Sequence, residues 1–188
     1  MGAKWVFATK NPHKLAEVQN LLEGILDIEG LPSDVPEAPE PHADLYGNAL
    51  AKATFYAQHL GLPVIAEDSG LFVPALGGQP GAQSAHFGGP ARLLEAMRDL
   101  SDRRAYFTAV VVAYISSRKY FFSTGFWQGE IAETPRGSEG FGYDPVFIPA
   151  GRKETVAELG QAWKQHHSHR SRAFRKLVKM LQGISPQE

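Results

Sequence analysis

The amino-acid sequence predicts an α/β protein in which helices flank both sides of a long mixed central β-sheet, forming two lobes. Three observations predict this class. An apolar run opens the chain and leads into a helical pattern, which is typical of a βα unit. Two long runs rich in Val, Tyr and Phe, 104–115 and 119–128, surround a short polar turn, as in an antiparallel hairpin. Apolar residues at helical spacing end the pattern between 173 and 181.

In the first half of the chain, residues 5–8 are expected to form a strand, and the polar turn 9–13 leads into a helix whose apolar face extends to residue 25. Segment 31–42 contains four prolines and is expected to be an ordered loop. A helix follows, with an apolar stripe from Ala49 to Leu60. Residues 64–66 should form a buried strand that turns sharply at Gly70, before a short strand at 71–73.

In the second half, residues 77–81 are expected to be a loop, and Pro90 suits the first turn of a helix. The hairpin follows. Residues 137–142 then hold three glycines in six positions, which indicates a second loop. Thr155 and Glu158 have the spacing of a capping box at the start of a further helix. We expect residues 1–188 to form one domain.

Composition excludes several classes of protein. Lys and Arg number 19 and Asp and Glu 20, so no overall positive field attracts a nucleic acid. The chain has no Cys, which excludes disulfides and thiol nucleophiles. The longest apolar stretch, Ala109 to Ile115, is far shorter than a membrane span, and the first residues do not resemble a signal peptide. We therefore expect a cytoplasmic protein that binds neither membrane nor nucleic acid.

The most informative segment is the acidic pair Glu67-Asp68, followed by Ser69, at the end of the strand that begins at Val64. Ligands of open α/β sheets commonly bind beyond the carboxyl ends of such strands. Neighbouring carboxylates repel each other unless they are solvated, paired with cations or bound to a divalent metal. The segment therefore predicts metal or general-base chemistry. The alternative is a solvated Asp-Ser-Gly turn.

A basic residue begins the first predicted helix. Lys14 follows the turn Thr9-Lys10-Asn11-Pro12-His13, whose backbone N–H groups can point at an anion. A helix N-terminus carries about half a positive charge, and Lys14 adds a full one. The turn therefore predicts a phosphate site, although it lacks the glycines of a P-loop. The alternative is an ordinary solvated lysine.

Two further segments carry chemistry. Residues 164–170 place five groups that can be cationic within seven positions. This run allows a zinc site using His167 and His169, an anion or carbonyl-oxygen site using Lys164, His169 and Arg170, or a solvated charge run. The segment Phe141-Gly142-Tyr143-Asp144 places aromatic rings beside glycines, which allows a nucleobase to stack. The alternative is that these rings belong to the core.

Taken together, these segments resemble the inosine triphosphate pyrophosphatase family along nearly the whole chain. Six motifs carry the resemblance, in the order that the family has them: Thr9 to Lys14; Glu40 with Asn48-Ala49-Leu50-Ala51-Lys52-Ala53; Glu67 to Leu71; Gly77 to Gly81; Gly140 to Pro145; and Ala157-Glu158-Leu159 with Lys164 and Ser168-His169-Arg170. The resemblance implies a nucleotide cleft between the two lobes. It implies magnesium-dependent hydrolysis of ITP, dITP and XTP to the monophosphate and pyrophosphate, and a homodimer.

The resemblance also implies roles for residues at matching positions. The triphosphate would be bound by Thr9, Asn11, Lys14 and Lys52, and the magnesium by Glu40, Glu67 and Asp68. Asp68 would be the catalytic base, and Ser69 would contact the substrate. Phe141 would stack on the purine, and Asp144, Lys164, His169 and Arg170 would surround it. Lys10, Pro12, His13, Gly142 and Tyr143 complete the expected substrate site.

The chain departs from the family pattern at several positions. Gly47 replaces a Glu, Glu139 a Gly and His86 an Arg, residues 165–167 are more polar, and the connection 88–91 is shorter. Two related hypotheses stay open: a Maf-like enzyme for modified pyrimidine triphosphates, and a nucleotide sensor without turnover. A nucleic-acid binder using the basic helix 164–179 is a third alternative.

Overall fold

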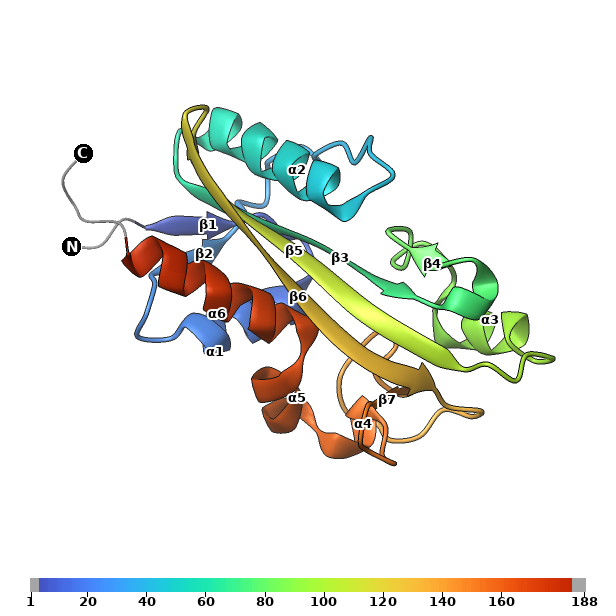
Figure 1. The fold of residues 1–188 in the computed structure, drawn as a ribbon. Coiled ribbons are helices and arrows are strands. Elements are labelled where there is room, and N and C mark those ends of the chain that lie inside the picture. The colour runs from blue at the N-terminus through green and yellow to red at the C-terminus, as the bar shows by residue number, and fades with distance from the viewer. Residues whose placement is uncertain (1–3, 184–188) are drawn as a thin grey trace. The chain divides into compact units, whose positions relative to one another are not determined.

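The computed structural model describes residues 4–183. The elements follow one another in this order: β1 (Trp5–Phe7), α1 (Pro12–Leu22), β2 (Ile28–Gly30), α2 (Leu45–Leu60), β3 (Val64–Phe72), a 3₁₀ turn (Pro74–Leu76), β4 (Pro80–Gly81), α3 (Gly89–Ala96), β5 (Arg104–Ser116), β6 (Lys119–Ile131), β7 (Phe147–Pro149), α4 (Val156–Leu159), α5 (Gln161–His167) and α6 (His169–Gln182) (Figure 1). The long mixed sheet and the flanking helices predicted from the sequence are confirmed.

The strands form one sheet in the order β2-β1-β3-β5-β6-β7, and β4 pairs with β3. Strand β1 runs parallel to both β2 and β3, whereas β4 is antiparallel to β3 and β7 is antiparallel to β6. The parallel part is therefore the βα unit expected at the start of the chain, and the hairpin β5–β6 supplies the antiparallel part.

The chain divides into two compact units. The first contains residues 1–68, 109–125 and 171–188, and the second contains residues 69–108 and 126–170. Neither unit is one continuous stretch of sequence, because β3, β5 and β6 each contribute to both units.

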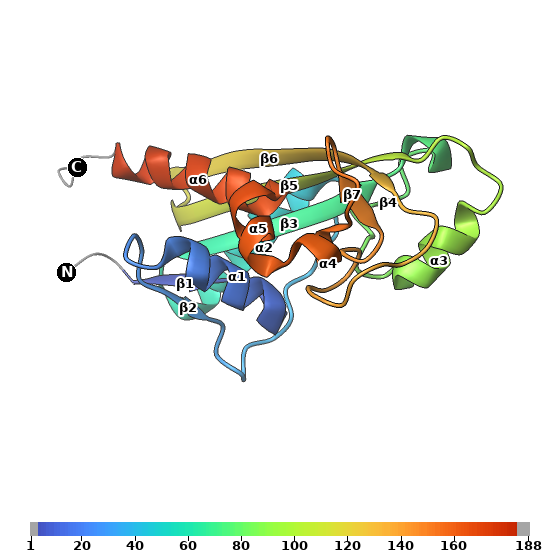
Figure 2. The ribbon, with the colours of Figure 1, turned by 90° about the horizontal axis from the view of Figure 1, so that it is seen from below.

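In the first unit, α1 and α6 lie on one side of the sheet and α2 lies on the other (Figures 1 and 2). The core between β1, β5, α1 and α6 includes Phe7, Leu22, Val111 and Phe174, all fully buried. Val110 and Val112, the neighbours of Val111 in β5, point to the opposite face of the sheet and are also buried, because both faces of this part of the sheet are covered.

Local sequence explains where these helices begin and end. The side chain of Asp44 accepts from the N–H of Gly47 and caps α2, and Gly61 ends α2 in a left-handed conformation with φ of 65°. The capping box predicted for Thr155 and Glu158 is present at the start of α4.

In the second unit, a core of large side chains lies between the sheet, α3 and α4. It includes Leu71, Met97, Trp127, Phe147 and Val156. The rings of Trp127 and Phe147 lie 5.2 Å apart, and their packing joins β6 to β7.

The structure corrects the prediction of a sharp turn at Gly70. Strand β3 continues from Val64 through Gly70 to Phe72, and Leu71 and Phe72 pair with β4. A side chain at Gly70 would collide with the carbonyl oxygen of Gly81, so this glycine allows the close approach of β4 rather than a turn. The loop expected at 77–81 therefore ends in a short strand.

Among residues 4–183, no helix combines the length and the apolar composition that crossing a membrane would require.

Candidate active site

The predicted site residues fall into two sets, one in each unit. The first unit contains Thr9, Lys10, Asn11, Pro12, His13, Lys14, Glu40, Lys52, Glu67 and Asp68. The second contains Ser69, Phe141, Gly142, Tyr143, Asp144, Lys164, His169 and Arg170. The first set is rich in carboxylates and lysines, and the second combines aromatic rings with cations.

The turn before α1 is built by its own side chains. Asn11 is the N-cap: its Oδ1 accepts from the N–H groups of His13 and Lys14, at 2.9 and 3.3 Å. Thr9 in turn accepts from the N–H of Asn11 at 3.1 Å through its Oγ1. Pro12 has no N–H to offer. The side chains of Asn11 and Thr9 therefore already accept from the N–H groups of residues 11, 13 and 14, and the positive end of the helix and Lys14 supply the attraction for an anion.

A hollow of about 290 Å³ opens beside this turn. Thr9, Lys10, Asn11 and Pro12 line it, together with residues 30–33 and Leu15. Four residues of the turn that the sequence predicts as a phosphate site thus line a single concave surface.

The acidic pair lies inside the sheet rather than in a solvated turn. Glu67 and Asp68 are 3% and 7% exposed, which excludes the alternative of a solvated Asp-Ser-Gly turn. Lys14 lies 3.9 Å from the carboxylate of Glu67. The Nζ of Lys52 forms an ion pair with Glu40 at 2.5 Å and also donates to the backbone oxygen of Glu67 at 3.5 Å. Three predicted acids and two predicted lysines therefore belong to one network.

Asp68 has the perturbed acidity that a general base requires. Its pKa is raised from 3.8 to about 6, mainly by burial, and the charge of Glu40 acts in the same direction. Lys52, Lys14 and a hydrogen bond from Asn48 act in the opposite direction. A carboxylate with this pKa is ionised at neutral pH, yet it is more basic than an ordinary Asp.

The acidic side chains of this network suit a hard divalent cation, because they offer carboxylate oxygens as metal ligands. Within residues 4–183, no cluster of three or more His, Asp or Glu side chains is arranged to hold a metal by itself. Magnesium usually binds through one or two carboxylates together with water and substrate phosphates, so Glu40 and Asp68 fit this requirement. The zinc alternative for His167 and His169 has no support.

The second unit builds its set around the loop 137–142. Asp144 is buried, and its Oδ2 accepts from the backbone N–H of Phe141 at 2.9 Å and from the Nζ of Lys164 at 2.7 Å. The same Nζ lies 4.1 Å from the centre of the Phe141 ring. One carboxylate thus fixes both the aromatic ring and the cation that lies over it.

The run 164–170 is not a solvated charge run at its key positions. Lys164, His169 and Arg170 are each at most 4% exposed. The ring of His169 stacks on Phe107 with centroids 4.5 Å apart, and the guanidinium of Arg170 lies 5.9 Å from the centre of the Phe141 ring. Three basic side chains separated by up to six positions therefore pack among aromatic rings.

Tyr143 occupies a different environment from Phe141. Its ring is part of the core of the second unit, and its hydroxyl donates to the backbone oxygen of Ser84 at 2.8 Å. Burial raises its pKa above the ordinary value of 10.0. Ser84 also accepts from the N–H of Leu71 and donates to Gly81, at 2.8 and 2.6 Å. Tyr143 and Ser84 together join the Phe141 loop to β3 and β4.

Gly47, where the family pattern has Glu, makes room for a neighbouring imidazole. A Cβ at position 47 would lie 2.6 Å from the Cγ of His42. The backbone N–H of His42 donates to Asn48 at 2.9 Å. The space beside the first turn of α2 is therefore filled by His42.

Sequence reasoning missed Asn48 and Phe107. Asn48 is 1% exposed, and its amide donates to Asp68 at 3.2 Å, so it orients the carboxylate. A polar side chain on the apolar stripe of α2 was the signal that could have identified it. Phe107 carried no such signal, because an aromatic residue in a strand is ordinary and its stacking on His169 joins distant segments.

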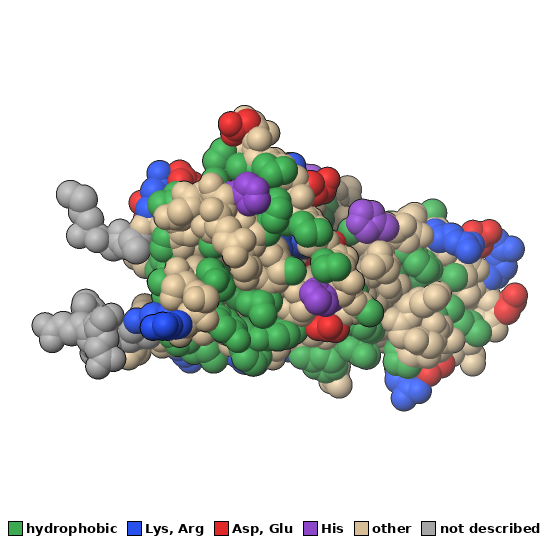
Figure 3. Space-filling model, turned by 90° about the horizontal axis from the view of Figure 1, so that it is seen from above, with side chains coloured by type: hydrophobic (Ala, Val, Ile, Leu, Met, Phe, Trp, Pro, Cys, Tyr) green, Lys and Arg blue, Asp and Glu red, His purple; other side chains and the backbone are tan. Residues whose placement is uncertain are grey.

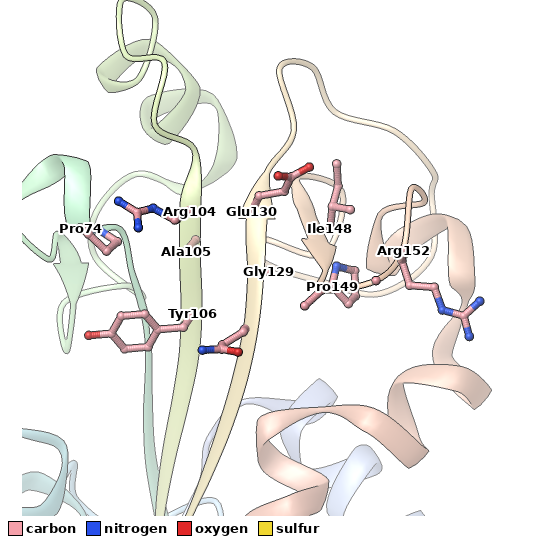
Figure 4. Close-up of a pocket in the computed structure, with 12 residues that line it drawn as sticks. Pro74, Arg104, Ala105, Tyr106, Gly129, Glu130, Ile148, Pro149 and Arg152 are labelled. Atoms are coloured by element: carbon pink, nitrogen blue, oxygen red, sulfur yellow. The ribbon is translucent and has the colours of Figure 1, made fainter.

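A second hollow, of about 480 Å³, lies in the second unit and contains none of the predicted residues. Residues of β5, β6 and β7 line it, among them Tyr106, Glu130 and Ile148 (Figure 4). Its Arg104 is held by Asp102 through two hydrogen bonds of 2.9 and 2.6 Å.

Comparison with known proteins identifies relatives along nearly the whole chain. A sequence model of the Ham1 family matches residues 5–180. The dITP/XTP pyrophosphatase of Aromatoleum aromaticum is 44% identical over 194 residues, which span 96% of this chain and 98% of that protein. The dITP/XTP pyrophosphatase of Porphyromonas gingivalis is 43% identical over 192 residues, which span 95% of this chain and 97% of that protein.

Solved structures agree with these sequence matches. A HAM1 protein from Coxiella burnetii is 36% identical and superimposes with a TM-score of 0.86, covering 97% of this chain and 100% of that one. The Staphylococcus aureus Ham1 protein is 32% identical with a TM-score of 0.84, covering 96% of this chain and 98% of that one.

Proposed function

Because this chain belongs to the Ham1 family, we propose that it hydrolyses dITP, ITP and XTP to the nucleoside monophosphate and pyrophosphate. The observation that carries the mechanism is Asp68, a buried carboxylate whose pKa is raised to about 6 within a network of lysines and acids. Such a group is suited to activate water beside a triphosphate. The reaction removes deaminated purine nucleotides from the nucleotide pool.

The first unit supplies the groups that suit the triphosphate and the chemical step. Lys14 and Lys52 contribute positive charge, and Thr9 and Asn11 shape the turn at the start of α1. Asp68 accepts a proton from water as the water oxygen bonds to the α-phosphorus. The bond from that phosphorus to the bridging oxygen then breaks, and pyrophosphate leaves. Asn48 holds the carboxylate of Asp68 in orientation during this transfer.

We propose Mg²⁺ as the cofactor, held by Glu40 and Asp68 with the substrate phosphates. Glu67 lies deeper in the strand and faces Lys14, so it supports the network rather than the cation directly. When bound, the cation would neutralise the negative charge that develops on the phosphates.

The second unit supplies the groups that suit a 6-keto purine. Phe141 offers a ring for stacking, and Lys164, His169 and Arg170, which pack against aromatic rings, offer donors for the 6-keto oxygen. ATP would present an amine to the same donors, and each buried group left unpaired costs about 1 to 3 kcal/mol. Several such contacts can therefore discriminate against ATP.

We also propose that the protein forms a homodimer. Strand β6 exposes Tyr120 and Phe122, at 41% and 49%, and Tyr46 of α2 packs against Phe122. Figure 3 shows hydrophobic side chains spread over the face that includes α2, with few charged ones among them. Sedimentation of the parent and of a Phe122→Asp variant tests this proposal: a dimer that becomes a monomer supports it, and an unchanged mass contradicts the interface.

The test of the proposed activity is a substrate panel. The purified protein is incubated with magnesium and ATP, GTP, ITP, dITP, XTP, UTP or dTTP, and pyrophosphate and orthophosphate are measured separately. Pyrophosphate from ITP, dITP and XTP, with little from ATP or GTP, is the expected result. Orthophosphate alone would contradict attack at the α-phosphorus, pyrimidine preference would favour a Maf-like enzyme, and tight ITP binding without turnover would favour a sensor.

A further inference from the structure

Glu139 links two segments that lie far apart in the sequence. It lies in the glycine-rich loop 137–142, at a position where the resemblance has Gly. Its Oε2 accepts from the backbone N–H of Gln161, the first residue of α5, at 3.0 Å. The preceding residue, Gly160, is the N-cap of α5 but has no side chain that could accept from the N–H groups of the helix. Glu139 therefore provides from a distant loop the acceptor that an N-cap residue normally provides.

Helix α5, which Glu139 caps, carries Lys164, the cation that lies over the Phe141 ring in the candidate purine site. Lys164 is the fourth residue of α5, and its backbone N–H bonds to the oxygen of Gly160, the N-cap of the helix, at 3.1 Å. Its side chain reaches Asp144 and the Phe141 ring. A change in the position of the first turn of α5 would therefore move the Nζ of Lys164 relative to the ring.

The loop is held on both sides of Phe141. Before the ring, Glu139 ties the loop to α5. After the ring, Asp144 accepts from the Phe141 N–H and from Lys164 on the same helix. Between them, Gly140 packs so closely on Asp144 that a side chain there would collide with its carboxylate. The loop and α5 thus form a closed ring of contacts around Phe141.

We propose that Glu139 is a positioning residue that assembles Phe141 and Lys164 into a preformed platform for the purine before substrate arrives. This inference rests on the proposed function and deepens it, because it assigns a part in purine binding to a residue outside the family motifs. Without the carboxylate, the loop would have to be ordered when the base binds, and that ordering would weaken binding. The chemical step at Asp68 would be unaffected.

The experiment compares the parent with Glu139→Ala, Glu139→Gln and the control Glu133→Ala, which removes an exposed carboxylate elsewhere in the same unit. Three quantities are measured: exchange of the Gln161 amide by NMR, the Kd of inosine monophosphate by calorimetry, and KM and kcat for ITP. In Glu139→Ala we expect exchange to accelerate about tenfold, and Kd and KM to rise about fivefold. We expect kcat to change less than twofold. Glu139→Gln keeps an acceptor oxygen and should restore most of the affinity.

The outcomes separate this inference from the proposed function. If the parent releases no pyrophosphate from ITP, the proposed function fails, and monophosphate affinity still tests Glu139. If Gln161 exchanges faster but the affinity of Glu139→Ala equals that of the parent, Glu139 only stabilises α5 and the inference is overturned. Unchanged exchange in Glu139→Ala, or an equal loss of affinity in Glu133→Ala, would overturn it as well.

Discussion

The two units contain buried carboxylates in opposite situations. In the first unit, Asp68 is buried with a raised pKa, and the nearby Lys52 is already paired with Glu40. In the second unit, Asp144 is equally buried but bonds directly to Lys164 at 2.7 Å. The difference indicates that the carboxylate proposed for proton transfer is buried at a cost in electrostatic free energy. The carboxylate that holds the recognition surface is instead fully paired.

The largest effect is expected on catalysis, from replacing Asp68. Asp68→Asn removes the base, so kcat for ITP should fall about 10³- to 10⁴-fold, which corresponds to about 4 to 5.5 kcal/mol of the barrier. Pyrophosphate release at saturating ITP and magnesium measures this loss. The matched control, Asp34→Asn, changes an exposed carboxylate and should retain parental activity. An Asp68→Asn enzyme as fast as the parent would show that Asp68 is not the base.

Breaking the ion pair of Asp144 should reduce the stability of the folded protein. Lys164→Met leaves Asp144 buried without its cation, and we expect the free energy of unfolding to fall by about 3 to 5 kcal/mol. Urea unfolding followed by circular dichroism measures the change. Lys153→Met, at an exposed position, is the control, and a double variant Asp144→Asn/Lys164→Met should recover part of the loss. Equal stability of Lys164→Met and Lys153→Met would mean that the pair is not important for folding.

The pH dependence of stability should distinguish Asp68 from an exposed acid. Because its pKa rises from 3.8 to about 6 on folding, the folded protein holds this proton more tightly than the unfolded chain does. Stability should therefore fall as pH rises from about 4 to about 6, by about 3 kcal/mol from this group. Asp68→Asn should be more stable than the parent by this amount at pH 8 and should have no advantage near pH 4.

Asp102 provides the control for that experiment, because Arg104 lowers the pKa of its carboxyl to about 2. Its contribution has the opposite sign: it is present above pH 4 and is lost as pH falls toward 2. Asp102→Asn should therefore show no gain at pH 8. Urea unfolding of both variants at pH 4.5, 6 and 8 makes the comparison. A parent whose stability is flat across this range would contradict the raised pKa of Asp68.

The smallest effect is expected at Glu40. Its ion pair with Lys52 is partly open to solvent, since the Glu40 side chain is 40% exposed, so Glu40→Gln should cost less than about 1 kcal/mol of stability. The magnesium concentration needed for half-maximal activity should nevertheless rise, because a donor of the cation is lost. Glu37→Gln is the exposed neighbour used as control. An unchanged magnesium requirement would remove Glu40 from the proposed metal site.

Local sequence predicted much of the candidate site and less of its geometry. The apolar run before Glu67 and the periodic apolar faces of α1, α2 and α6 carry direct signals, so the strand, the helices and the acidic pair were found. The path of β3 past Gly70 was not, because it depends on the carbonyl of Gly81, which lies close only after folding. The burial of Lys164, His169 and Arg170 was also hidden, since a run of cations usually indicates a solvated surface.

Contacts between distant segments were hardest to foresee. Glu139 and Gln161 are 22 positions apart, and the sequence shows only that Glu139 departs from a glycine. His42 fills the space left by Gly47, a relation that needs the coordinates of both residues. Such pairs depend on three-dimensional proximity, which local periodicity does not encode.

The passage of β3, β5 and β6 through both units has a consequence for how this protein can be divided or recombined. The unit boundaries fall inside the strands, at 68/69, 108/109 and 125/126, as well as at 170/171 in α6. No single cut in a loop separates the units, and neither can be produced as a contiguous fragment. Grafting the recognition half of one relative onto the catalytic half of another would require four junctions, each within a regular element. New substrate preferences are therefore more accessible through point changes in loops such as 137–142 than through exchange of whole units.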